Sequence, residues 1–453
     1  MSITSRTTRI SLLLIIASTF SLTACSQSES ELTLRNTAEF VRVNTPTNSV
    51  EERLVGLTGA LVADATDVIV AKNPSSEAAL KEAGDAGLPV LPITSQSKTL
   101  IKKLGAQTHT SNPQGRAKVD TISSTLVLFA SEPTKAETHL LRLTGASSLT
   151  VTRDPRLDQE AQVLIAKHKR VVSALPQHYP AEVVYRKATV AGDTYLLFDN
   201  QHFLAMYGHP SGPALGVLGE QGPKASVARV NTLVSKYEKS APGVTFQPAF
   251  EIITTVATAG PGKRKDYSAR TDISELRPLV DAAKANGITV ILDLQPGRSS
   301  MLEQAKYYEE LLREPHVGLA LDPEWKLGKK GKPLQRIGHV NARQVNEVSA
   351  WLAALTRENV LPQKMFVLHQ FQRQMIRDRE DVNTNHPELA SVIHVDGQGP
   401  TGAKIATWKH IRKDAPDNVH WGWKNFVDED VPMLNTTQTW QRVKPHPDLI
   451  TYQ

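Results

Sequence analysis

The sequence predicts an α/β protein, with parallel α/β repeat units in its amino-terminal region and a (β/α) barrel in its carboxy-terminal region. Two observations predict this fold class. Short apolar runs alternate with helical stretches from about residue 50 to residue 176, as they do in a parallel sheet. From residue 203 onward the alternation is more regular and yields seven candidate strands in about 250 residues, the usual size of a barrel domain.

Residues 1–24 are typical of a signal peptide. Arg6 and Arg9 precede an apolar run over residues 10–22, and small residues lead to Ala24. A helix of about 13 residues at 1.5 Å each covers about 20 Å, which is short of the roughly 30 Å core of a bilayer. We therefore expect this segment to be cleaved rather than to span a membrane.

Cys25 is the only cysteine of the chain and follows the expected cleavage site. Residues 22–25 (LTAC) resemble the lipobox read by lipoprotein signal peptidase. The resemblance implies that the Cys25 thiol carries a diacylglycerol and the freed amine a further chain such as palmitate. Two or more chains anchor a protein stably. We expect an extracytoplasmic protein, lipid-anchored to the cell membrane and without disulfides, in which residues 25–49 form a tether.

Charge and composition limit the function classes. The formal net charge of +6 falls to +4 once Arg6 and Arg9 are removed. This modest balance argues against a nucleic-acid partner, although it suits a surface that faces anionic envelope polymers. The 429 residues that remain of 453, with 40% hydrophobic residues overall, suffice for two domains.

Residues 50–180 contain an internal repeat. Strands are expected at 61–63, 67–71 and 87–93 with a helix near residues 78–83, and a second copy runs through 126–130, a helix ending at 143–146 and a strand at 149–152. Aligning Pro74 on Pro133 superposes two strand-helix-strand units about 59 residues apart.

The first unit resembles the cell wall-binding repeat type 2, on residues 68–71 (VIVA), the Ala-rich helix, 87–91 (GLPVL) and 104–106 (LGA). It departs from that family at its helix start, which is 76–79 (SEAA). The resemblance covers about 110 residues and implies binding to wall polysaccharide or peptidoglycan through shape and charge, with no single contact residue. The alternative is a Rossmann-like domain that only packs. Neither unit has the Gly-x-Gly-x-x-Gly turn of a nucleotide site, so no cofactor is expected.

A hairpin is expected to connect the two regions. Residues 183–186 and 194–198 flank Ala191, Gly192 and Asp193, which form a plausible turn. We therefore predict a connecting hairpin over residues 181–200, before a barrel domain that covers residues 201–453.

The barrel is expected to be of the TIM type. Its candidate strands are 203–207, 245–256, 288–294, 317–321, 365–369, 390–395 and 419–423, and its helices 225–239, 273–286, 301–313 and 342–357. An eighth strand is either formed by the last residues or missing.

Function in such barrels resides at the carboxyl ends of the strands, and here these ends are unusually polar. Each polar residue alone could be a turn former, whereas together they predict a cleft. The residues are Tyr207, His209, Glu251, Asp293, Gln295, Asp322, Glu324, Trp325, His369, His394, Asp396, Trp421 and Trp423.

Carboxylates beside tryptophans indicate a sugar substrate. Glycoside hydrolysis needs a carboxylic acid to protonate the leaving oxygen, and repulsion between Asp322 and Glu324 would raise the proton affinity of one of them. The Asp-x-Glu that ends strand four resembles that of chitinase-like and lysozyme-like glycoside hydrolase barrels, although their longer run of acids is absent. The resemblance implies Glu324 as the acid and Asp322 as its helper, with Asp293 or Glu251 polarising nearby.

Substrate contacts are expected from the other polar and aromatic residues at the strand ends, with the tryptophans stacking on sugar rings. These residues are Tyr207, His209, Gln295, Trp325, His369, His394, Asp396, Trp421 and Trp423.

The sequence thus predicts an envelope lipoprotein that binds and hydrolyses a cell-wall or extracellular glycan. Two alternatives stay open. One is a non-catalytic wall-binding lipoprotein with a degenerate barrel. The other is a metal-dependent hydrolase, since His and acidic side chains at several strand ends could converge on one ion. No His-x-His or helical His pair supports a metal, so none is predicted.

Overall fold

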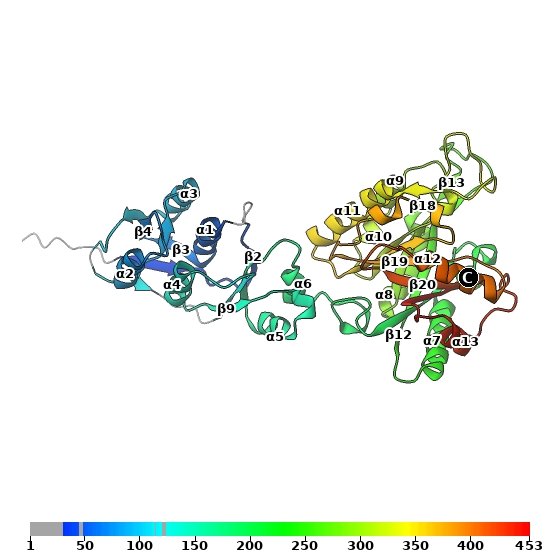
Figure 1. The fold of residues 1–453 in the computed structure, drawn as a ribbon, viewed down its shortest axis with the longest axis horizontal. Helices are drawn as coiled ribbons and strands as arrows, with labels where there is room; N and C mark the ends of the chain where they lie inside the picture. The colour runs from blue at the N-terminus through cyan, green and yellow to red at the C-terminus, as the bar shows by residue number, and fades with distance from the viewer. Residues whose placement is uncertain (1–29, 45–48, 114, 120–123) are drawn as a thin grey trace, which may run out of the picture.

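A computed structural model describes residues 30–44, 49–113, 115–119 and 124–453. The predicted signal peptide and Cys25, the predicted lipidation site, lie outside the described residues. The chain forms an amino-terminal α/β region and a carboxy-terminal barrel, and Figure 1 shows them at opposite ends of an elongated molecule. None of the helices formed by the described residues is both long enough and apolar enough to cross a membrane.

The amino-terminal region contains two copies of one βαβαβ unit. The first comprises β4 (Asp67–Ala71), α2 (Glu77–Ala86), β5 (Val90–Pro92), α3 (Ser95–Leu104) and β6 (Gln107–His109). The second comprises β8 (Thr125–Phe129), α4 (Lys135–Thr144), β9 (Ser147–Thr150), α5 (Gln159–Lys167) and β10 (Arg170–Ala174). In both copies the strands are parallel, and the first strand lies between the second and the third.

Helix caps fix the register of this repeat. α2 and α4 each end at a glycine in the left-handed conformation, Gly87 and Gly145. These glycines are 58 residues apart, as are the first residues of β4 and β8 at 67 and 125. The structural repeat is therefore 58 residues long, against a predicted spacing of about 59.

Strands begin earlier than expected. β1 (Glu31–Leu34) pairs with β3 (Val62–Ala65) and β7 (Lys118–Val119), and β2 (Phe40–Arg42) pairs with β10. α1 (Val50–Leu61) leads into β3. Leu32 and Leu34 are both buried, since alternate residues of β1 face the core. The tether predicted for residues 25–49 is thus wrong from Glu31 onward.

The connecting hairpin predicted for residues 181–200 is also wrong. This segment forms helix α6 (Ala181–Tyr185) and the 3₁₀ turn η2 (Ala191–Asp193). Val183 and Val184 are adjacent and both buried, whereas neighbours in a half-exposed strand would point to opposite faces.

Nearby, the turn η1 (Pro155–Leu157) contacts the barrel, where Arg156 donates a 2.7 Å hydrogen bond to the carbonyl of Pro387.

Eight parallel strands form the closed barrel, which is of the TIM type. They are β11 (Gln201–Gly208), β12 (Thr245–Ala257), β14 (Thr289–Leu294), β15 (Val317–Leu321), β17 (Lys364–His369), β19 (Leu389–Val395), β20 (His420–Asn425) and β21 (Leu449–Tyr452). β11 pairs with both β12 and β21, and this closes the sheet. All seven predicted strands are confirmed, and the last residues of the chain supply the eighth.

Helices surround the barrel, and short elements occupy the loops at its ends. The helices are α7 (Pro223–Ser240), α8 (Ile273–Ala285), α9 (Met301–Tyr307), α10 (Glu309–Leu312), α11 (Ala342–Glu358), α12 (Thr401–Arg412) and α13 (Thr436–Arg442). The loop elements are η3 (Pro213–Leu215), η4 (Val217–Glu220), β13 (Ser268–Arg270), η5 (Pro323–Trp325), β16 (Val340–Asn341), η6 (Arg373–Met375), β18 (Ile376–Arg377) and η7 (Arg379–Asp381). The helix predicted over 301–313 is split at Tyr308, which caps α9 and whose hydroxyl donates to the carbonyls of Thr254 and Thr271.

Candidate active site

Strand alternation brings the polar residues of the site into the barrel interior. The apolar interior layer includes Ala205, Ala249, Ile291, Ala320, Val367, Val392 and Leu449. Seven side chains that follow these by two residues are Tyr207, Glu251, Asp293, Asp322, His369, His394 and Thr451. Positions i and i+2 of a strand share one face, so these side chains face inward above the apolar layer. All seven are buried.

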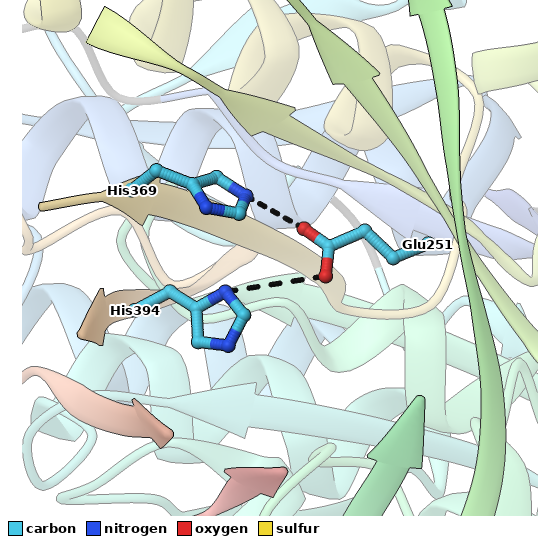
Figure 2. A group of neighbouring side chains, drawn as sticks. All are labelled: Glu251, His369 and His394. Carbon is cyan, nitrogen blue, oxygen red and sulfur yellow. Dashed lines mark hydrogen bonds and ion pairs between the residues drawn. The ribbon is translucent and has the colours of Figure 1, made fainter. Parts of the chain in front are cut away.

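A hydrogen-bonded ion-pair network joins four of these strands. His369 lies between two carboxylates, with its Nδ1 at 2.8 Å from Asp396 Oδ2 and its Nε2 at 2.7 Å from Glu251 Oε1. Thr451 donates to Glu251 Oε2 at 3.2 Å, and His394 Nδ1 lies 3.9 Å from the same oxygen. Figure 2 shows both imidazoles directed at the Glu251 carboxylate.

Charge accounts for the protonation states in this network. Burial opposes ionisation of Glu251, but the neighbouring His369 outweighs it and lowers the pKa of Glu251 to about 2. Burial likewise opposes protonation of His369, yet Glu251 and Asp396 raise its pKa well above the usual value. His369 is therefore an imidazolium that donates both N–H groups, while burial lowers the pKa of His394 to about 3 and keeps it neutral.

A second cluster is built on Tyr207. Its hydroxyl donates to Asp293 Oδ2 at 2.8 Å, and Gln295 Nε2 approaches that hydroxyl at 3.5 Å. The ammonium group of Lys424 lies 3.5 Å from the centre of the Tyr207 ring. This contact is a cation–π interaction that holds a buried positive charge beside Asp293.

Asp322 and Glu324 stand where β15 ends. Asp322 caps the turn η5 and accepts the backbone N–H of Glu324 at 3.3 Å. Gly338 closes the following loop and donates to the Glu324 carbonyl at 2.6 Å. A Cβ on Gly338 would lie 2.5 Å from the carbonyl oxygens of Pro323 and Glu324, so only glycine allows this approach.

Three carboxyl groups of the site hold protons unusually tightly. Burial raises the pKa of Asp293 to about 6, and burial together with Asp396 raises the pKa of Glu324 to about 7. Burial and the charge of Glu324 raise the pKa of Asp322 well above its usual value. The predicted repulsion between Asp322 and Glu324 therefore raises the pKa of Asp322. Among the acidic residues, Asp396 has the largest effect on the pKa of Glu324.

A cavity of about 690 Å³ opens at the carboxyl ends of the strands. Glu324, Asp322 and Trp325 line it together with Phe371 and Phe426. A smaller groove of about 210 Å³ shares Glu324, Trp325 and Leu334 with the cavity and continues past Arg336. The carboxyl group of Glu324, which holds a proton near neutral pH, thus faces a space that has aromatic walls and is large enough for sugar rings.

The structure brings together most of the residues predicted from the sequence. Those that line the cavity are Tyr207, Gln295, Asp322, Glu324, Trp325 and Asp396. Glu251, Asp293, His369 and His394 are wholly buried beside them. Ten of the thirteen strand-end residues therefore form one continuous site.

Three predicted contacts are displaced from this site. His209 is buried against Ser211 and Thr271, at 2.7 and 2.8 Å, and does not line the cavity. Trp423 belongs to the cluster around Trp408 on α12, with ring centres 5.9 Å apart, and Trp421 packs against the same cluster. The expectation that both β20 tryptophans stack on substrate is wrong, because odd-numbered residues of β20 face the outer helices.

Sequence reasoning missed Lys424, Thr451 and the aromatic wall formed by Phe371 and Phe426. The signal for Lys424 was the alternation of β20, in which Gly422 and Lys424 take the inward positions between outward tryptophans. Thr451 was missed because the eighth strand had not been placed.

Stability is expected to fall as the pH rises from about 4 to about 7. The folded protein binds the protons of Asp293 and Glu324 more tightly than the unfolded chain, whose ordinary pKa values are 3.8 and 4.5. This contribution is complete below those ordinary values and is lost above the raised ones. We expect Glu324→Gln to stabilise the protein at pH 8 by up to about 3 kcal/mol and to give no gain at pH 4, measured by chemical denaturation. Equal gains at both pH values would contradict the raised pKa of Glu324.

No model of a known protein family matches the chain, and a search of curated proteins finds no relative. The geometry of the site is therefore the basis for assigning a function.

Proposed function

We propose that this protein is an envelope-anchored glycoside hydrolase in which Glu324 is the general acid. The observation that carries this proposal is the position and protonation of one side chain. Glu324 faces a cavity of about 690 Å³, and its pKa is raised to about 7, so its carboxyl group retains a proton at the pH where it would have to donate one. Trp325 and Phe371 line the same cavity and offer flat apolar surface to a sugar ring.

The other carboxyl groups would have separate roles. Asp322 lines the cavity beside Glu324 and would orient a polar substituent of the sugar, such as an N-acetyl group. Asp293 is held by Tyr207 at 2.8 Å and would stabilise positive charge that develops on the sugar ring. Glu251 and Asp396 are both engaged by His369 and would set the electrostatic field of the site, and Asp396 also lines the cavity.

Basic loops beside the cavity favour an anionic glycan. Lys329, Lys330, Lys332 and Arg336 are exposed on the loop between η5 and α11, and this loop contains no acidic residue. A second exposed basic run, Lys263 to Lys265, lies on the loop before β13. Arg298 joins the two loops. Its backbone N–H donates to the backbone carbonyl of Asp266 at 2.7 Å, and its guanidinium donates to the backbone carbonyl of Gly331 at 2.9 Å.

Neutralising this loop tests the preference for anionic substrates. We expect Lys329→Gln, Lys330→Gln and Lys332→Gln together to weaken binding to an acidic wall polysaccharide about tenfold at low salt, with little effect at 0.5 M salt, where exposed charges are screened. Binding can be measured by isothermal titration calorimetry. The matched control replaces three exposed lysines of α7, at positions 224, 236 and 239. A loss that is equal in control and test variants, or insensitive to salt, would exclude a specific role of the loop.

The amino-terminal region would hold the barrel at its substrate. The lipobox-like residues 22–25 would place a lipid on Cys25, and the two βαβαβ units would contact wall polymer as their likeness to cell wall-binding repeats implies. Cys25→Ser is expected to shift the full chain from the membrane fraction to the medium. Retention of this variant in the membrane fraction would contradict lipid anchoring.

The proposed activity is tested directly by the release of reducing ends. Purified protein should release them from isolated cell wall or from its acidic polysaccharide, with more activity at pH 6 than at pH 8. Binding to the polysaccharide without release of reducing ends would instead support a non-catalytic wall-binding protein.

A further inference from the structure

A three-residue cluster at the centre of the barrel combines two imidazoles with one carboxylate. Glu251, His369 and His394 come from β12, β17 and β19, and one ligand atom from each lies within 4.8 Å of the others (Figure 2). All three side chains are fully buried. Two histidines with one carboxylate form a ligand set that zinc and other first-row divalent ions accept.

His394 is the observation that points to a ligand. Neither of its ring nitrogens has a hydrogen-bond partner among the described residues, although the side chain is fully buried. A buried polar group without a partner costs free energy, and such groups in native proteins call for an explanation. The ring is also closely confined, because a Cβ on Gly422 would lie 2.3 Å from His394 Cδ2. Gly422 therefore leaves room for the imidazole, whose two ring nitrogens are buried without partners.

The surroundings resemble the outer shell of a metal site. Asp396 bonds Nδ1 of His369, which leaves Nε2 of that ring directed at Glu251. A carboxylate on the far nitrogen is the usual means of orienting a metal-binding histidine. Thr451 holds the other carboxylate oxygen of Glu251 at 3.2 Å. The other ionisable side chains around the cluster are Lys424, Tyr207 and the three acids Asp293, Asp322 and Asp396.

We propose that Glu251, His369 and His394 bind one divalent transition-metal ion of the zinc class. The ion would take the place of the proton that His369 shares with Glu251, and it would give His394 the partner that it lacks. Zinc bonds of about 2.0–2.2 Å separate neighbouring ligand atoms by roughly 3.3–3.6 Å in a tetrahedral site. Glu251 Oε1 lies 2.7 Å from His369 Nε2, and Glu251 Oε2 lies 3.9 Å from His394 Nδ1, one distance shorter and one longer than that separation. The ion would hold the floor of the cavity, and this role does not depend on Glu324 being a general acid.

Metal binding can be measured on the full-length protein after treatment with a chelator. Isothermal titration calorimetry with Zn²⁺ should give one site per chain with a sub-micromolar Kd, and Co²⁺ should produce visible absorption bands of a low-symmetry site. His394→Ala should weaken Zn²⁺ binding at least about 100-fold, and Asp396→Asn about 10–100-fold. His209→Ala is the matched control, since His209 is buried at the same end of the barrel with both ring nitrogens already bonded.

The outcomes separate this proposal from the proposed hydrolase. Absence of Zn²⁺ and Co²⁺ binding by the wild type, or binding that His394→Ala leaves unchanged, would overturn the metal site. Melting temperatures of the metal-free variants show whether they fold, and Zn²⁺ should raise the melting temperature of the wild type and of His209→Ala but not of His394→Ala. Glu324→Gln should bind Zn²⁺ like the wild type even where hydrolysis is lost, so either proposal can fail without the other.

Discussion

Glu324→Gln is expected to lower kcat for glycan hydrolysis by about 10²–10⁴-fold while leaving KM within a factor of about three. Glutamine keeps the size of the side chain and its hydrogen-bonding capacity but cannot donate a proton to the leaving oxygen. Binding surfaces such as Trp325 and Phe371 remain in place, so substrate affinity should persist. The measurement is steady-state release of reducing ends together with equilibrium binding of the same polysaccharide.

Glu347→Gln supplies the control, because Glu347 is exposed on α11 outside the cavity and should keep full activity. The wild-type rate should also fall as the pH rises above about 7, where Glu324 loses its proton. A substrate whose leaving group needs no protonation should recover much of the rate of Glu324→Gln. Unchanged kcat in this variant would remove Glu324 from the acid role.

His369→Leu is expected to destabilise the protein by about 3–5 kcal/mol. The imidazolium of His369 lies between Glu251 and Asp396, at 2.7 and 2.8 Å, and all three residues are buried. Leucine would leave two carboxylates in the barrel interior without their shared cation. The measurement is urea unfolding at pH 7 with chelator present, which excludes any contribution of a bound metal.

His410→Leu on the exposed face of α12 provides the comparison and should change stability by less than about 0.5 kcal/mol. Adding Glu251→Gln to His369→Leu should recover part of the loss, since it removes one of the two unpaired charges. A cost below about 1 kcal/mol for His369→Leu would mean that the network is not ionised as described.

Much of the barrel was predictable from local sequence. An apolar run flanked by polar turns, followed by a helical pattern, identifies a barrel strand without knowledge of its neighbours, and seven strands were found in this way. The site followed from the rule that function resides at the carboxyl ends of such strands, which placed Glu324, His369 and Asp396 in one group. Those residues do converge in the structure.

The errors arose where a residue's surroundings come from distant segments. Val183 and Val184 were expected in a strand of a hairpin. Both lie in helix α6 instead, and both are buried there. Trp421 and Trp423 were expected in the cleft because tryptophans suit sugars, whereas β20 directs them toward α12. The chemical type of a side chain indicates which interactions it can make. The face of the strand on which it lies decides whether it reaches the cavity.

By itself the sequence determined the class of the fold, the order of the strands and the set of acids and histidines at their ends, because these depend on short-range periodicity. The tertiary structure decided which of those groups carry charge. Contact with His369 lowers the pKa of Glu251 to about 2, whereas burial and the charge of Asp396 raise the pKa of Glu324 to about 7, and these partners lie far apart in the chain. Packing of β19 against β20 also buries His394 beside Gly422 without a partner for either ring nitrogen, which no local pattern could indicate.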